Sequence, residues 1–338
     1  MDAQPMTMGI VGLGMWGENR MKSVLSKAAQ VRVKSCYHYK PEKAKAFAEK
    51  WNLEIAPTYE DMLADPEIEG VFIFTANYLH PEQTVTAAEA GKHAYLTKPI
   101  ADTVAEAREM EAACEKAGVL CYVDHGSSTA NGTFRMKWVI DQGLIGDVIM
   151  AEAQQSSGWG LRLTGEEWRA HAKTCPGGAL IQVGCYNTAT LYLLFGQAKR
   201  VTAFNRNDYT PHDIDDACML LVEYPNGTIA CVSSSYAVAV NTSYYRLYGS
   251  KGNLFANPRY QERGLRLITA DTWKYREPEI PDDVRGPDKL DEFVHCARTG
   301  DTPVNSAELA TQAVAIVNAA LKSAQENRPV ELTEILEQ

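Results

Sequence analysis

The sequence lacks the features that mark several large classes of protein. Its 338 residues carry a formal net charge of -10, whereas nucleic acids and anionic membranes bind basic surfaces. No apolar run approaches the roughly 18–20 residues that a membrane-spanning helix needs. The N-terminus lacks the basic and apolar regions of a signal peptide. We therefore expect a cytoplasmic protein that binds neither nucleic acid nor membrane.

Disulfide and metal-binding patterns are missing too. The eight cysteines are scattered without a Cys-x-x-Cys pair, and some stand inside apolar runs, as Cys218 and Cys231 do. Such thiols fit reduced, buried cysteines in a cytoplasmic protein. No cluster of His, Cys and Asp has the spacing of metal ligands, so we expect no metal site. The acidic segment His212–Asp216 is interpreted as a solvated loop.

A glycine-rich turn is present near the N-terminus. Residues 6–11 form an apolar run that predicts a strand, and a helical pattern follows the turn. The pattern G-x-G-x-x-G between a strand and a helix predicts a dinucleotide site, because glycines let the backbone approach a pyrophosphate at the helix N-terminus. The residues expected to contact the cofactor here are Gly12, Gly14, Met15, Trp16 and Gly17.

The second predicted strand, 31–37, indicates which cofactor is preferred. NAD sites usually place a carboxylate about 20 residues beyond the glycines to hold the ribose hydroxyls. No carboxylate stands at 36–40, whereas His38 and Lys40 do. A carboxylate would repel a 2′-phosphate and these groups would not, so the pattern favours NADP. The alternative is that Lys40 caps the next helix and the cofactor is NAD.

Apolar strands and helical patterns alternate up to residue 124, which predicts a doubly wound parallel sheet of the Rossmann type. The strand 93–96 is followed by Lys98 and Pro99. Proline keeps the preceding residue extended, and ligands bind at the carboxyl ends of parallel strands. Lys98 is therefore a candidate for contact with cofactor and substrate. The alternative is a surface lysine in a loop.

Three stretches of this half resemble one known family. They are the glycine turn at 12–17, the loop Thr75-Ala76-Asn77-Tyr78-Leu79-His80, and Glu89–His93 leading to Lys98-Pro99. The chain resembles the Gfo/Idh/MocA family of NAD(P)-dependent oxidoreductases over essentially its whole length. Members typically carry Glu where Thr97 stands and Pro where Ala76 stands. The resemblance implies further cofactor contacts at Thr75, Ala76, Asn77, His80, Lys98 and Pro99.

In much of the second half of the chain, strand patterns follow one another without helical patterns between them. Consecutive strand patterns after a βαβ half predict a separate α+β domain. We divide the chain into a dinucleotide-binding domain at 1–124 and a substrate-binding and oligomerisation domain at 125–338. The latter is expected to be an open, mostly antiparallel sheet with helices on one face. The resemblance implies a homo-oligomer, a dimer or tetramer.

The polar and aromatic segment 154–175 is a candidate substrate loop, since indoles stack on sugar rings and guanidinium groups bind hydroxyls. The alternative is a solvated loop in which tryptophans serve as hydrophobic pins. The candidate substrate contacts are Lys98, His125, Trp159, Trp168, Arg169, Gln182 and Tyr186.

The stretch Gly177-Gly178 to Asn187 resembles the second signature of the family, Gly-Gly followed by Asp-x-Gly-x-His-x-x-Asp. Gln182, Tyr186 and Ala189 stand at the aspartate, histidine and final aspartate positions. Tyrosine at the histidine position is a known variant. Because Thr97 and Gln182 replace two acids, we expect a more positive local field, which favours tyrosinate or an anionic substrate.

The resemblance implies hydride transfer between nicotinamide and a secondary alcohol or ketone of a sugar, cyclitol or related small polyhydroxy compound. Tyrosine is a poor base at neutral pH, and a nearby ammonium stabilises tyrosinate. We therefore expect Tyr186 and Lys98 to be the acid/base pair. Three alternatives remain. They are an NAD-dependent enzyme that cleaves glycosides through transient oxidation, a catalytically silent, cofactor-binding regulatory protein, and a reductase of a non-sugar substrate such as a dihydrodiol or imine.

Overall fold

A computed structural model describes residues 4–257 and 264–337 of the chain. The chain divides into two compact units. Unit 1 comprises the residues up to Ala101, Ala105–Asp124 and Pro287–Glu308. Unit 2 comprises Asp102–Val104, His125–Gly286 and the residues from Leu309 onward. One boundary between the units falls between Asp124 and His125, and Pro287–Glu308 packs with unit 1.

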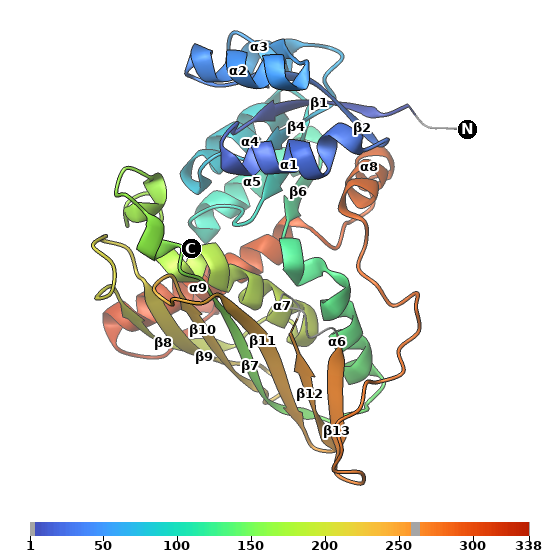
Figure 1. Cartoon of the computed structure of the whole chain (residues 1–338), viewed down its shortest axis with the longest axis vertical. Coiled ribbons are helices and arrows are strands. Elements are labelled where there is room, and N and C mark those ends of the chain that lie inside the picture. The colour runs from blue at the N-terminus through green and yellow to red at the C-terminus, as the bar shows by residue number, and fades with distance from the viewer. Residues whose placement is uncertain (1–3, 258–263, 338) are drawn as a thin grey trace. The chain divides into compact units, whose positions relative to one another are not determined.

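Unit 1 is a parallel sheet with helices between its strands (Figure 1). Its strands run in the order β3-β2-β1-β4-β5-β6. They are β1 (Met6–Val11), β2 (Val31–Tyr37), β3 (Glu54–Ile55), β4 (Gly70–Ile73), β5 (His93–Thr97) and β6 (Cys121–Asp124). Its helices of eight or more residues are α1 (Met15–Ser23), α2 (Pro41–Trp51), α4 (His80–Glu89), α5 (Val104–Ala117) and α8 (Lys289–Thr299). Its shorter helices are η1 (Leu25–Lys27), α3 (Tyr59–Ala64) and η2 (Asn77–Leu79). The Rossmann prediction is confirmed.

The core of unit 1 explains why α8 belongs to it. β1 and β4 are buried along their whole length, as parallel strands covered on both faces must be. Phe293 of α8 packs edge-on against Tyr95 and Tyr122, at ring-centroid distances of 5.3 and 5.6 Å. The Tyr122 hydroxyl donates to Glu292 Oε2 at 2.7 Å. Aromatic packing and this hydrogen bond hold α8 against β5 and β6.

Unit 2 is built on one large sheet with the order β13-β12-β11-β7-β10-β9-β8-β14. Its strands are β7 (Val148–Ser156), β8 (Arg200–Arg206), β9 (Ala217–Glu223), β10 (Ile229–Ser235), β11 (Thr242–Gly249), β12 (Gly252–Ala256), β13 (Leu265–Thr269) and β14 (Val330–Glu331). β7 and β10 are parallel, while the other neighbours are antiparallel. The mostly antiparallel sheet expected from the sequence is confirmed.

The helices of unit 2 lie on one face of this sheet (Figure 1). The long helices are α6 (Asn131–Asp141), α7 (Cys185–Phe195) and α9 (Ala307–Glu326), and the short ones are η3 (Gly126–Thr129), η4 (Gly160–Arg162), η5 (Trp168–Ala170), the π-helix η6 (Leu180–Gly184) and α10 (Thr333–Leu336). Thr190 of α7 accepts a hydrogen bond from Tyr245 of β11 at 3.1 Å. Ser323 of α9 accepts one from the Ala203 amide of β8 at 3.1 Å. These hydrogen bonds hold α7 and α9 against one face of the sheet.

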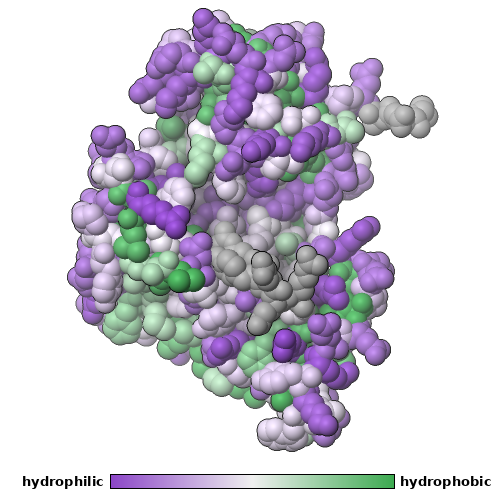
Figure 2. Space-filling view, in the orientation of Figure 1, coloured by the Kyte–Doolittle hydropathy of each residue, from purple (hydrophilic) through white to green (hydrophobic). Residues whose placement is uncertain are grey.

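The face of the sheet turned away from the helices carries exposed apolar side chains. Along β9 the buried and exposed residues alternate, so Met219 and Leu221 point away from the helices and are 58% and 54% exposed. Phe204, which pairs with Met219 across β8 and β9, is 70% exposed. Figure 2 shows apolar surface around β8 to β10, at the lower left.

Candidate active site

The turn between β1 and α1 has the shape of a dinucleotide cradle. Gly12 has φ +83°, and a Cβ there would lie 2.2 Å from the Phe74 carbonyl carbon. A Cβ on Gly17 would lie 2.3 Å from the Gly12 carbonyl oxygen. Around Gly14 no such contact exists within 4 Å, so its backbone faces open space. These three environments fit a tight turn, close helix packing and a backbone open to pyrophosphate.

The residues after β2 present imidazole and ammonium groups without a carboxylate. His38 Nδ1 accepts a hydrogen bond from the Lys40 amide at 2.9 Å, and the His38 ring stacks on Tyr39. Burial and the nearby Lys43 ammonium lower the pKa of His38, which favours the neutral imidazole. Lys40 is the N-cap residue of α2, but its side chain makes no capping hydrogen bond. Its ammonium lies 5.6 Å from the Tyr39 ring centroid.

The turn after β5 is supported from behind by a buried histidine. Lys98 is partly exposed, its amide donates to the Asp124 carbonyl at 3.1 Å, and its peptide bond to Pro99 is cis. His80 Nδ1 lies 3.0 Å from the Pro99 carbonyl oxygen and 3.2 Å from that of Ile100. The His80 side chain has no exposed surface, so it holds the turn rather than facing a ligand. Its predicted cofactor contact would require movement.

The loop after β4 is partly buried in the same way. Asn77 is 3% exposed and Ala76 is 9% exposed. The Thr75 hydroxyl donates to Gln83 Oε1 at 2.7 Å. Of these predicted cofactor contacts, Thr75 has the more accessible side chain.

A charged cluster at the end of β6 was not predicted from the sequence. The Asp124 side chain is fully buried and pairs with Arg20 of α1 and Lys289 at the start of α8. The Tyr95 hydroxyl donates to the same carboxylate at 3.1 Å. Asp124 thus ties the cofactor-binding helix to α8. Its partners lie far apart in sequence, so no local pattern could have indicated them.

In unit 2, Tyr186 lies at the start of α7, directly after the π-helix η6. Gly178 has φ +42°, and a Cβ there would lie 2.2 Å from the Asp215 carbonyl oxygen. The same carbonyl accepts from the Ala179 amide at 2.9 Å. The interpretation of His212–Asp216 as a solvated loop is wrong, because Ile214 and Asp216 are fully buried. The segment instead supports the start of the helix.

The Tyr186 ring packs against backbone. A Cβ added at Gly126, whose φ is +57°, would lie 2.9 Å from Tyr186 Cε1. Ser128 donates from its hydroxyl to the Tyr186 carbonyl at 2.7 Å. Tyr186 is partly exposed, whereas Cys185 and Asn187 beside it are buried. The predicted substrate contact His125 is 1% exposed, which places it beneath the surface.

Arg169 connects the segment 154–175 to the helix that carries Tyr186. Its Nε donates to Gln182 Oε1 at 3.3 Å, and its guanidinium carbon lies 4.1 Å from the Trp168 ring centroid. Trp159, by contrast, packs against a cluster that includes the buried Tyr236. For Trp159 the structure therefore favours the role of a hydrophobic pin. Tyr236, which the sequence did not single out, carries a phenol close enough to Arg169 to affect its pKa.

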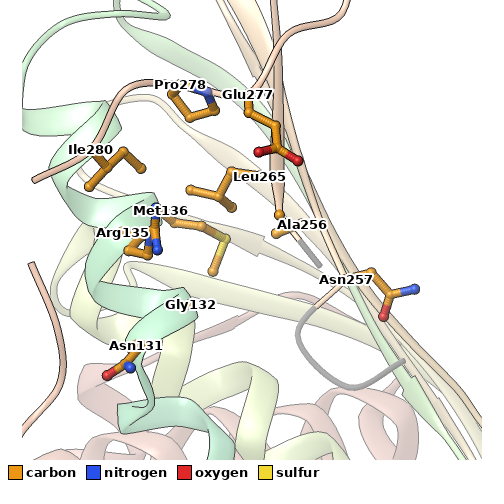
Figure 3. A pocket seen from close by; sticks show the side chains of 11 residues that line it. Asn131, Gly132, Arg135, Met136, Ala256, Asn257, Leu265, Glu277, Pro278 and Ile280 are labelled. Carbon is orange, nitrogen blue, oxygen red and sulfur yellow. The ribbon is translucent and has the colours of Figure 1, made fainter. Parts of the chain in front are cut away.

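A cavity of about 370 Å³ lies elsewhere in unit 2 (Figure 3). Met136 of α6 and Leu265 of β13 point into it, and no predicted site residue lines it. Among residues 4–257 and 264–337, no group of His, Cys, Asp and Glu is arranged to hold a metal ion. In the same ranges, no helix has both the length and the apolarity that crossing a membrane would take.

Comparison with known proteins agrees with this geometry. Residues 6–125 match the oxidoreductase family with an NAD-binding Rossmann fold, and residues 134–255 match the GFO/IDH/MocA C-terminal domain. The chain is 27% identical to 1,5-anhydro-D-fructose reductase of Ensifer adhaerens over 62% of its own length and 63% of that relative. It therefore spans less than two thirds of this relative.

Two further similarities extend over almost the whole chain. D-xylose 1-dehydrogenase (NADP(+)) 2 of Haloferax volcanii is 26% identical over 97% of this chain and 100% of its own. The crystal structure of aldose-aldose oxidoreductase from Caulobacter crescentus has a TM-score of 0.85 and 25% identity, covering 97% of this chain and 99% of that one. The chain belongs to the GFO/IDH/MocA family of NAD-binding oxidoreductases.

Proposed function

We propose that the protein is an NAD(P)-dependent dehydrogenase or reductase that acts on a secondary alcohol or ketone of a sugar, cyclitol or related polyhydroxy compound. The observation that carries the proposal is the partly exposed Tyr186, which lies near the start of α7 and is backed by Gly126. The open backbone at Gly14 supports the cofactor half. The names of the relatives, which denote sugar reductases and dehydrogenases, support the substrate class.

The bound nicotinamide supplies hydride chemistry, and the protein handles the proton. In the proposal Tyr186 gives or takes the hydroxyl proton at its phenol oxygen. The Lys98 ammonium polarises the reacting oxygen. Gly12, Gly14 and Gly17 with the N-terminus of α1 hold the pyrophosphate. Positioned acid/base groups typically contribute about 100-fold to 10,000-fold in rate.

The test is a screen of sugars and polyols with NAD and NADP, followed by absorbance at 340 nm. Tyr186→Phe and Lys98→Met should each reduce kcat to less than about a tenth of the wild-type value. Cofactor affinity, measured by fluorescence titration of Tyr186→Phe, should stay close to that of the wild type. Retention of more than a tenth of kcat in either variant contradicts the acid/base pair. Cofactor binding without turnover across the panel contradicts the enzymatic function.

We also propose that the enzyme prefers NADP. The support is the absence of a carboxylate at 36–40, together with the exposed ammonium of Lys40 beside Tyr39. Replacing Lys40 with aspartate should lower the ratio of kcat/KM for NADP over NAD by about tenfold or more, since a 2′-phosphate would lose a cation and meet an anion. Lys45→Asp, at an exposed position of the same helix α2, is the matched control. A wild-type preference for NAD above tenfold would refute this reading.

The exposed apolar face of the unit 2 sheet supports a homo-oligomer as a further proposal. Phe204, Met219 and Leu221 form neighbouring apolar positions on β8 and β9. Light scattering should report more than one copy in the wild type. Met219→Lys with Leu221→Lys should shift the mass toward a single copy, and an unchanged mass would contradict association through this face.

A further inference from the structure

Arg169 differs from the other arginines in residues 4–257 and 264–337. Most of them form ion pairs with Asp or Glu. Those that do not, apart from Arg169, are exposed to water: Arg135, Arg162, Arg266, Arg276 and Arg285. Arg169 alone among the described arginines is both partly buried and without an ion pair. Water cannot fully hydrate its charge, and no protein carboxylate neutralises it.

The groups around the guanidinium are neutral. Gln182 accepts from Nε through an amide oxygen, and the face of Trp168 lies against the guanidinium plane. Burial lowers the pKa of Arg169, and the groups that counteract this effect are the tyrosines 236 and 186 and the thiol of Cys175. At their ordinary pKa values, phenols and thiols are largely uncharged at neutral pH. In the described part of the chain, neither terminal nitrogen of Arg169 donates a hydrogen bond.

Glu167 of the same loop and Asp213, which binds the loop from another segment, are already engaged. Glu167 accepts from the Thr164 amide and hydroxyl, each at 2.9 Å. Asp213 accepts from the Ala172 amide at 2.9 Å and lies 3.9 Å from His171. Both carboxylates are thus held by donors other than Arg169. A partly buried charge without a partner is costly, and an anionic ligand would offset that cost.

We propose that the substrate carries a carboxylate and that the two terminal nitrogens of Arg169 bind it, so that the natural substrate is a sugar acid. This inference rests on the proposed function, whose site it refines. The planar guanidinium fork matches a carboxylate in bidentate geometry. Gln182 is central to the selection, because it occupies Nε without neutralising the charge. A carboxylate at residue 182 would pair with Arg169 and compete with an acidic substrate.

A carboxylate fits this site better than a phosphate ester. A phosphate monoester carries close to two negative charges at neutral pH and is commonly held by several cations. The other cations of the loop, Arg162 and Lys173, are exposed and none pairs with the groups around Arg169. One guanidinium with neutral neighbours balances one negative charge.

The experiment compares matched sugars with the full-length protein and NADP. The pairs are D-glucose with D-glucuronate and D-galactose with D-galacturonate, and D-glucose 6-phosphate is the phosphate arm. The wild type should show a kcat/KM ratio of acid over neutral sugar of about tenfold or more, the size expected of a charge-assisted pair. Arg169→Gln and Gln182→Glu should both reduce that ratio by about tenfold. Arg169→Lys keeps the charge but loses the planar fork. Its ratio should lie between those of the wild type and Arg169→Gln.

A second readout does not depend on turnover. The uronates should raise the melting temperature of the wild type, and Arg169→Gln should abolish the shift while leaving the NADP-induced shift in place. If neutral sugars were oxidised as efficiently as sugar acids, the inference that the substrate carries a carboxylate would be overturned. The proposed function would still stand. Uronate shifts that vanish in Arg169→Gln, without turnover of any sugar, would support the anion site and contradict the function. A stronger effect of the phosphate ester, or no shift with either uronate, would overturn the inference.

Discussion

Two charged side chains, one in each unit, are treated in opposite ways. The Asp124 carboxylate in unit 1 is fully buried and meets two cations and a phenol from its own unit. The Arg169 guanidinium in unit 2 meets an amide and an indole, and the tyrosines close enough to affect its pKa are Tyr236 and Tyr186. Both charges are partly or wholly removed from water. One is neutralised by the fold, and the other is not.

The difference separates structure from recognition. A buried charge with protein partners fixes the elements that supply them, here α1 and α8 against the end of β6. A charge without a protein partner has its interaction energy left for a ligand. Removing the first should damage stability, and removing the second should damage selectivity. Substitutions of Asp124 and Arg169 test that separation, and a substitution of Gly126 tests the uncharged support of Tyr186.

The largest effect is expected from Asp124→Asn. It leaves the Arg20 and Lys289 charges without their common counter-ion, which typically costs about 3–5 kcal/mol when a buried pair is broken. Urea denaturation followed by circular dichroism should show the loss. Lys289→Met is the control and should cost less, because Arg20 and Tyr95 still bind the carboxylate. Equal stability of Asp124→Asn and the wild type would contradict the structural role of the Asp124 charge.

An intermediate effect is expected from Gly126→Ala, which acts on Tyr186 rather than on a charge. The new Cβ would lie 2.9 Å from the Tyr186 ring, and the left-handed backbone costs a non-glycine residue about 1–2 kcal/mol. We expect kcat to fall severalfold while the KM for NADP stays constant. Gly143→Ala, at φ +64° but with no atom within 4 Å, separates backbone strain from displacement of the ring. Similar kinetics in the two variants would show that the Tyr186 contact does not matter.

The smallest change in stability is expected from Arg169→Gln. It removes a partly buried charge that has no ion pair, so the free energy of unfolding should change by less than about 1 kcal/mol. The urea midpoint should therefore stay near the wild-type value even where selectivity is lost. A destabilisation as large as that of Asp124→Asn would mean that Arg169 is a structural charge and that the comparison fails.

Much of the fold was predictable because its signals are local. The strand, glycine turn and helix around residues 6–23 read directly from hydrophobicity and glycine spacing, and the structure places β1 and α1 there. The two-residue strand β3 and the pairing of α8 with unit 1 were not predicted. Phe293 belongs to the aromatic core of unit 1 although it lies 169 residues after Asp124 along the chain, and sequence spacing carries no signal for such packing.

The candidate site divides in the same way. Its residue types, such as Lys98 before a proline and Tyr186 after a glycine pair, were readable because each follows a short motif. The sequence did not indicate which candidate side chains are accessible to a ligand, as the buried His80 and His125 show. Burial depends on what packs above a residue, and that is supplied by segments distant in the chain.

The sequence by itself determined the parallel and antiparallel sheets, the dinucleotide turn and the absence of an acid at position 182, because these depend on residue type and on spacing within a few turns. The tertiary structure decided which charges are neutralised inside the protein. Asp124 finds Lys289 only when α8 returns to unit 1, and Arg169 finds the neutral Gln182 where η5 meets η6. Electrostatic energy depends on distance in space and on burial, and the fold sets both.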